Sequence, residues 1–196
     1  MSSVSVVEAG VGESTLVPVP GRVLSEYTQG DFKLTMWIPS DYAGRVIGKK
    51  GAVITNLLRE TRAKQINAMQ PVGRSLWLPV VISGEYRHAL AAYDAIAEIV
   101  EGEVDDVVLE FQINPRKPFF LYGPRKSAII AETSAGSGAR LFFPDTRQNK
   151  ANPALEGGCE SVKKAVLLLE IEAVKYQAQN ASKEKAGVGV DAGVGL

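Results

Sequence analysis

Residues 38–51 read IPSDYAGRVIGKKG, and this stretch decides the fold. Its proline ends a strand pattern, and Ser40 and Asp41 are residue types that favour the start of a helix. That helix must end before Gly48, because a second apolar helical pattern begins directly after Gly51. The stretch therefore predicts two helices joined by a short loop with glycine at both ends.

The segments on either side of this stretch extend it to six elements. Residues 32–38 alternate apolar and polar side chains, as a half-buried strand does, and residues 52–61 place apolar side chains on one helical face. Two strands are predicted at 63–69 and 76–82, followed by a helix from about 89 to 100. The predicted order is βααββα, in the α+β class.

The same order recurs from Val107, which indicates an internal duplication. The residues before and after the two repeats, 1–30 and 179–196, lack a sustained period and are predicted to be flexible tails. The segments of the second repeat are a strand at 107–113, a short helix and its loop at 118–126, a helix at 127–135, strands at 139–145 and 153–157, and a helix at 161–178.

Charge is unevenly distributed, although the formal net charge is zero. Residues 43–75 hold seven basic side chains and one acidic side chain, whereas residues 84–110 hold one basic and eight acidic side chains. A module with separated basic and acidic regions can orient a polyanion. The alternative is that both regions are ordinary solvated surface.

The composition also argues against several classes of site and protein. Cys159 is the single cysteine and His88 the single histidine, so we expect no disulfide framework, no metal site and no cofactor. No partner for His88 can be assigned in a catalytic set, and we expect that the protein is not an enzyme. No apolar run is long enough to span a membrane, and no secretion signal is recognisable. We expect a cytoplasmic protein, with the nucleus as the alternative.

The loop Gly48-Lys49-Lys50-Gly51 is the best candidate for a binding site. Backbone N–H groups at the start of a helix attract anions, and glycine removes the Cβ atoms that would hold a phosphate away. Lys49 and Lys50 add two full positive charges. The alternative is that the glycines only end one helix and begin the next.

The first repeat resembles the type I KH domain family over residues 32–101. The resemblance rests on Ile38-Pro39, on residues 44–51, on Ile54, and on residues 81–84 followed by Ala89 and Ala92. It implies a three-stranded antiparallel sheet packed against three helices. Pro79 is unexpected in the third strand, which the family places mid-sheet, so we expect a bulge or a strand that begins at Val80.

In this family the loop contacts the backbone of about four nucleotides of single-stranded nucleic acid. The resemblance implies RNA, or less readily DNA, with the bases in a groove whose floor includes Gly44, Ile47 and Ile54. Both isoleucines are also suited to the core. The predicted nucleic-acid-binding residues are Gly44, Arg45, Ile47, Gly48, Lys49, Lys50, Gly51, Ile54, Lys64, Ile66 and Arg74.

The second repeat resembles the divergent KH domains of vigilin and Bicaudal-C proteins. It has Gly123-Pro124-Arg125-Lys126 in the place of the loop, without the final glycine, so the grip on phosphate is predicted to be weakened or lost. Arg125 and Lys126 are auxiliary candidates for RNA contact. The alternative is a module kept for packing or for a protein partner.

The predicted domains are residues 31–103, a KH domain with an intact loop, and residues 104–178, a divergent KH-like domain. The leading hypothesis is a protein that binds single-stranded RNA in post-transcriptional regulation. The second hypothesis is a protein-interaction scaffold in a ribonucleoprotein complex. The oligomeric state is not predicted.

Overall fold

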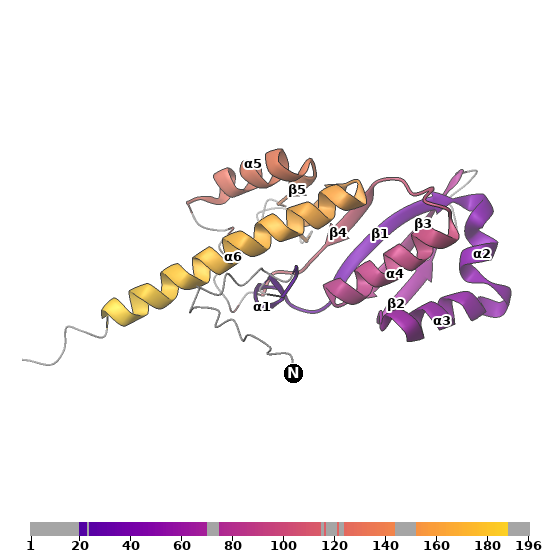
Figure 1. The fold of residues 1–196 in the computed structure, drawn as a ribbon, viewed down its shortest axis with the longest axis horizontal. Coiled ribbons are helices and arrows are strands. Elements are labelled where there is room, and N and C mark those ends of the chain that lie inside the picture. Colours follow the sequence, from indigo (N-terminus) through magenta and orange to yellow (C-terminus); the bar gives the residue numbers. More distant parts are fainter. Residues whose placement is uncertain are drawn as a thin grey trace, which may run out of the picture.

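The computed structural model describes residues 20–22, 24–69, 75–114, 116, 121, 124–143 and 152–187. These residues form a sheet of six strands in the order β2-β3-β1-β4-β6-β5, with each strand antiparallel to its neighbours (Figure 1). The strands are β1 Phe32–Pro39, β2 Gln65–Ala68, β3 Trp77–Gly84, β4 Val107–Glu110, β5 Arg140–Phe142 and β6 Ala154–Gly157.

The first half of the chain confirms the predicted βααββα order. Its helices are α2 Ala43–Ile47, α3 Ala52–Thr61 and α4 Tyr86–Ile99, with short 3-10 turns at Ser40–Tyr42 and Lys49–Gly51. Alternate residues of β1 are buried, as the sequence pattern predicted. They face α4, which crosses β1 and β3 (Figure 1).

The second half contributes β4, α5 Lys126–Ser137, β5, β6 and α6 Cys159–Gly187. The predicted strands and the two longer helices are confirmed, whereas most of the predicted short helix at 118–126 lies outside the described residues. The helix α6 continues to Gly187, although a tail was predicted from residue 179, because the added residues are mostly good helix formers. Among the described helices, none is long and apolar enough to cross a membrane.

A short helix near the N-terminus, α1 Leu24–Tyr27, corrects the prediction that residues 1–30 form a flexible tail. Residues 1–19 of that tail lie outside the described part of the chain. The backbone N–H of Leu24 donates to the buried carboxylate of Glu170 on α6 at 2.8 Å, and the ring of Tyr27 lies edge-on to that of Tyr176 at 6.2 Å. A four-residue helix is too short to produce a helical period in the sequence.

The two halves share one sheet, whereas the sequence predicted three strands for each of two modules. The strands β1 and β4 pair at the centre of this sheet, with Leu34 opposite Leu109, and both side chains are buried. The ring of Phe111 lies 6.2 Å from that of Phe32. The buried side chains of both halves therefore form one continuous core.

Pro79 lies within β3 without a bulge, so neither expectation for this residue is correct. Its carbonyl oxygen accepts from the backbone N–H of Met69 at 2.9 Å, on the β2 side. Both backbone groups of a strand residue face the same neighbour, so the missing N–H of Pro79 also faces β2. The proline therefore costs no hydrogen bond between β3 and β1. Its missing N–H faces the chain just beyond β2, which ends at Ala68.

Cys159 begins α6 and lies beside α4. Burial raises the pKa of its thiol, and the side chain of Tyr93 on α4 hydrogen-bonds to it. Lys163 of α6 reaches Asp94 of α4 at 3.4 Å. The cysteine is therefore a protonated, packed side chain at neutral pH, and these contacts join the helices of the two halves.

Candidate nucleic-acid interface

The loop between α2 and α3 has a left-handed backbone at three of its four positions. The φ angles are +73° at Gly48, +54° at Lys50 and +78° at Gly51. The N–H of Gly48 donates to the carbonyl of Gly44 at 2.9 Å, and the N–H of Gly51 donates to the carbonyl of Gly48 at 3.2 Å. The chain therefore turns sharply between the helices and presents both lysines on the turn.

The two glycines of the loop have different structural roles. A Cβ atom at Gly48 would lie 2.5 Å from a side-chain carbon of Val53 and 2.9 Å from its backbone nitrogen, so no other residue fits there. A Cβ atom at Gly51 would meet nothing within 4 Å. The first glycine is needed for close packing, whereas the second is needed for its backbone conformation and leaves open space above the loop.

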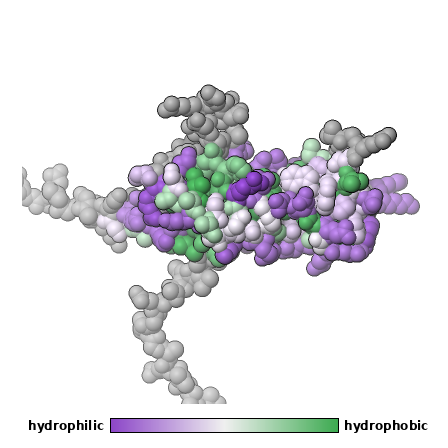
Figure 2. Space-filling model, turned by 90° about the horizontal axis from the view of Figure 1, so that it is seen from above, coloured by the Kyte–Doolittle hydropathy of each residue, from purple (hydrophilic) through white to green (hydrophobic). Residues whose placement is uncertain are grey.

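Lys49 and Lys50 are exposed, and neither makes an ion pair with a residue that the structure describes. No side chain caps the start of α3, which begins directly after the loop. The end of the molecule that carries α2 and α3 is largely hydrophilic in Figure 2. Two unneutralised ammonium groups at the start of a helix are suited to an anion.

On the surface of α2 next to the loop, Gly44 leaves space for a ligand and Arg45 provides a positive charge. Gly44 is exposed, and a Cβ atom there would meet nothing within 4 Å. Arg45 lies over the ring of Tyr42 at 5.1 Å and forms an ion pair with Glu101 at 2.9 Å. The two predicted floor residues, Ile47 and Ile54, are half-buried, so each combines packing with an accessible edge.

Three other predicted residues lie apart from the loop or outside the described chain. Lys64 lies beyond the far end of α3, about 15 Å along that helix, and forms an ion pair with Asp31 at 2.7 Å. Ile66 is 6% exposed and belongs to the core. Arg74 lies outside the described residues.

In the corresponding loop of the second half, both basic side chains interact with other residues of the protein. Arg125 approaches Glu172 at 3.7 Å and Glu132 at 4.0 Å, and the ammonium group of Lys126 lies 5.0 Å from the ring centre of Phe143. Gly123 lies outside the described residues. Arg125 thus forms ion pairs and Lys126 a cation–π contact within the protein, whereas Lys49 and Lys50 form no ion pair with a described residue.

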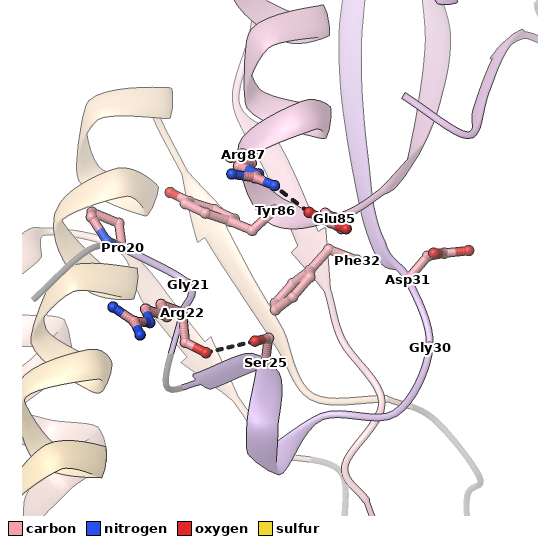
Figure 3. A pocket seen from close by; sticks show the side chains of 10 residues that line it. All are labelled: Pro20, Gly21, Arg22, Ser25, Gly30, Asp31, Phe32, Glu85, Tyr86 and Arg87. Atoms are coloured by element: carbon pink, nitrogen blue, oxygen red, sulfur yellow. Dashed lines mark hydrogen bonds and ion pairs between the residues drawn. The ribbon is translucent and has the colours of Figure 1, made fainter. Parts of the chain in front are cut away.

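A cavity of about 360 Å³ lies away from the loop, between α1 and the start of α4 (Figure 3). The rings of Phe32 and Tyr86 line it, 5.8 Å apart and edge to face, and Arg87 at its rim is paired with Glu85 at 3.2 Å. No group of three or more potential metal ligands occurs among the described residues. The residues that line the cavity come from 20–32 and 85–87, so the cavity is separate from the candidate interface.

Comparison with known proteins gives the first half a family. Residues 33–98 match the KH domain family model. The chain therefore contains a KH domain, a fold that generally binds single-stranded nucleic acid.

Two solved structures are similar to parts of this chain. The first type I KH domain of human vigilin is 24% identical, over 38% of this chain and 76% of that chain, with a TM-score of 0.33. The regulatory subunit of aspartate kinase from Thermus thermophilus is 15% identical, over 75% of this chain and 98% of that chain, with a TM-score of 0.27.

Sequence reasoning missed Glu101, which competes for Arg45. Its charge was recognised only as part of an acidic region, and the separation of 56 residues from Arg45 leaves no local signal. The residue follows α4 with a φ of +58°, which turns the chain back toward α2. The carboxylate of Glu101 lies 2.9 Å from one guanidinium nitrogen of Arg45 and therefore competes with a phosphate for this cation.

Replacing Glu101 with glutamine is therefore expected to raise the affinity for single-stranded RNA. The ion pair is exposed, and such pairs contribute about 0.2–1 kcal/mol, so the gain should be up to about fivefold. Fluorescence anisotropy with a labelled oligonucleotide would measure it. The matched control is Glu103→Gln, which makes the same change of charge nearby. An equal gain in both variants would show a general charge effect and contradict a role for the Arg45 pair.

Proposed function

We propose that the KH domain binds single-stranded RNA through residues 48–51 and the adjacent surface of α2, in post-transcriptional regulation. The observation that carries the proposal is the pair Lys49 and Lys50, exposed and without ion pairs to described residues, on a left-handed turn before α3. Single-stranded DNA has the same backbone charge and is the less favoured ligand. The proposed role is binding rather than catalysis, in the cytoplasm.

In this proposal, basic side chains contact the phosphates of the ligand, and a separate apolar surface contacts its bases. The lysines and Arg45 neutralise phosphates, which supplies affinity without sequence preference. The open position at Gly44 lets a base approach α2, and the accessible edges of Ile47 and Ile54 offer it an apolar surface. A duplex keeps its bases stacked inside and cannot make this second set of contacts.

The second half is proposed to be a degenerate KH-like unit over residues 104–178. Support comes from its strand and helix order, and from the loop cations Arg125 and Lys126, which bind within the protein. We propose that this half gives rigidity or contacts a protein partner, rather than holding RNA. A scaffold role in a ribonucleoprotein complex would use the same half.

Salt dependence tests the phosphate contacts. If Arg45, Lys49 and Lys50 neutralise about three phosphates, log affinity should fall with log salt at a slope of roughly −2, because each contact to a single strand contributes about −0.7. Titrations of an unstructured oligonucleotide at several salt concentrations would give the slope. The control is the same sequence as a duplex, for which weak binding is expected. A flat response for the single strand would rule out a phosphate grip.

A further inference from the structure

The helix α3 lies between two basic residues in the left-handed backbone conformation. Lys50 precedes it with a φ of +54°, and Arg62 follows it with a φ of +60°. This conformation suits glycine and is strained for a residue with a Cβ atom. Among the described residues other than glycine, Glu101, the partner of Arg45, is the third with a positive φ. All three place a charged side chain where glycine would fit without strain.

Arg62 is exposed, and its side chain forms no hydrogen bond, ion pair or ring contact with a described residue. Helices commonly end in this left-handed conformation with glycine, and less often with asparagine. The guanidinium group of Arg62 therefore contributes no contact to the described fold that would offset the strained backbone. Strained residues of this kind cluster at ligand-binding sites, so a ligand is the expected partner of this group.

Arg62 follows the predicted floor of the groove along α3, which runs from the loop toward β2 (Figure 1). Residues four apart lie above one another on a helix, so Ile54, Leu58 and Arg62 form one stripe along α3. Ile54 and Leu58 are half-buried and keep an accessible edge. The stripe is thus apolar near the loop and ends in a cation.

Arg59 adds a second cation at this end of α3. It is exposed, forms no ion pair with a described residue, and donates a hydrogen bond to Asn56 at 3.0 Å. It lies three residues before Arg62, a spacing that makes two residues neighbours on a helix surface. The nearest acid in the sequence, Glu60, is two residues from Arg62, and residues at that spacing do not face each other. We name Arg59 and Arg62 the far-end pair.

The length of α3 separates the far-end pair from the lysines of the loop. Its ten residues make it about 15 Å long. A stacked strand advances about 3.4 Å per nucleotide, so this length corresponds to about four nucleotides. A single strand that lies along the stripe therefore has phosphates within reach of both ends of α3.

We propose that the far-end pair is a second phosphate-binding site, which holds the single strand at the end of α3 opposite the loop. The inference rests on the proposed function, because it adds contacts to the same ligand. Arginine suits this role, since its planar guanidinium group binds a phosphate through two parallel hydrogen bonds. Contacts at both ends of α3 hold the bases between them against Ile54 and Leu58.

Arg62→Gly tests the site, because glycine keeps the backbone conformation and removes the charge. Fluorescence anisotropy with a labelled twelve-nucleotide single-stranded RNA of randomised sequence would measure the affinity. One phosphate contact contributes about −0.7 to the salt slope, or about fivefold in affinity at 0.1 M salt relative to 1 M. Arg62→Gly should therefore bind about fivefold more weakly, and Arg62→Gly with Arg59→Gln about 25-fold, with slopes less steep by about 0.7 and 1.4. Arg62→Lys should retain most of the affinity.

Thermal unfolding separates a role in binding from a role in the fold. Arg62→Gly should raise the Tm by up to about 3 °C, because glycine relieves the strain at this position. An arginine that served only to favour the negative end of the helix dipole would instead make the glycine variant less stable. A lower Tm with unchanged RNA affinity would assign Arg62 to the fold and overturn the proposal.

The matched control is Lys164→Gln on α6, which removes one charge at an exposed position without an ion pair to a described residue. An equal loss of affinity in this control would show a general charge effect and overturn the proposal. If Lys49→Asp with Lys50→Asp abolished binding but Arg62→Gly with Arg59→Gln changed neither affinity nor slope, the second site alone would be wrong. If the wild-type chain bound no RNA, the proposed function would fail together with this inference.

Discussion

The double substitution Lys49→Asp with Lys50→Asp is expected to abolish measurable binding of single-stranded RNA, a loss of at least about 100-fold. Each lysine contact with a phosphate contributes on the order of 1.5 kcal/mol, and the aspartates add repulsion. The fold should remain intact, because both side chains are exposed and form no ion pair with described residues. A filter-binding assay would measure affinity, and circular dichroism would check the fold.

The control for this experiment must separate a local contact from total charge. Lys164→Asp with Lys175→Asp makes the same change of net charge at exposed positions on α6, far from α2 in Figure 1. Near-normal binding is expected for it. Arginine at both loop positions should preserve binding, since the charges remain. If the aspartate variant bound RNA normally while folded, the loop would not be the phosphate grip.

Phe111→Ala is expected to destabilise the whole described fold by about 3–5 kcal/mol. The side chain is 1% exposed and lies at the junction of the halves, 6.2 Å from the ring of Phe32. Truncation of a buried phenylalanine removes apolar contacts and leaves a cavity. Urea denaturation followed by tryptophan emission would measure the loss. Both tryptophans lie in the first half, so a shifted midpoint shows that damage in the second half reaches the first.

Phe142→Ala provides the matched comparison, because the same side chain is removed from a position that is 47% exposed. Its effect should be below about 1 kcal/mol. A tryptophan transition that Phe111→Ala leaves unchanged would show that the halves unfold independently. That outcome would contradict the continuous core.

Much of the first half could be predicted from sequence, because its signals are local. The alternation in β1 and the apolar face of α3 each lie within one element, and the loop between α2 and α3 is framed by its glycines. The conformation of Gly48 could not be predicted from the motif alone. Glycine is required at position 48 because Val53 packs against it, and Val53 takes that position as part of the helix α3.

Contacts between distant segments could not be predicted. The pairing of β1 with β4, the hydrogen bond from Leu24 to Glu170 and the ion pair of Arg45 with Glu101 each join residues that share no local pattern. Charge counts identified Arg45 and Lys64 as candidate contacts, but counts do not show which cations have carboxylate neighbours. The structure distinguishes them from Lys49 and Lys50.

The pairing of β1 with β4 has a practical consequence for fragments of this protein. A cut near residue 103, where the sequence places a domain boundary, would separate the two central strands of the sheet. Each fragment would then carry an unprotected strand edge that can recruit another molecule, which favours aggregation. Poor solubility of an isolated half is expected from this exposed edge and from core side chains, such as Leu34 and Leu109, that the other half no longer covers.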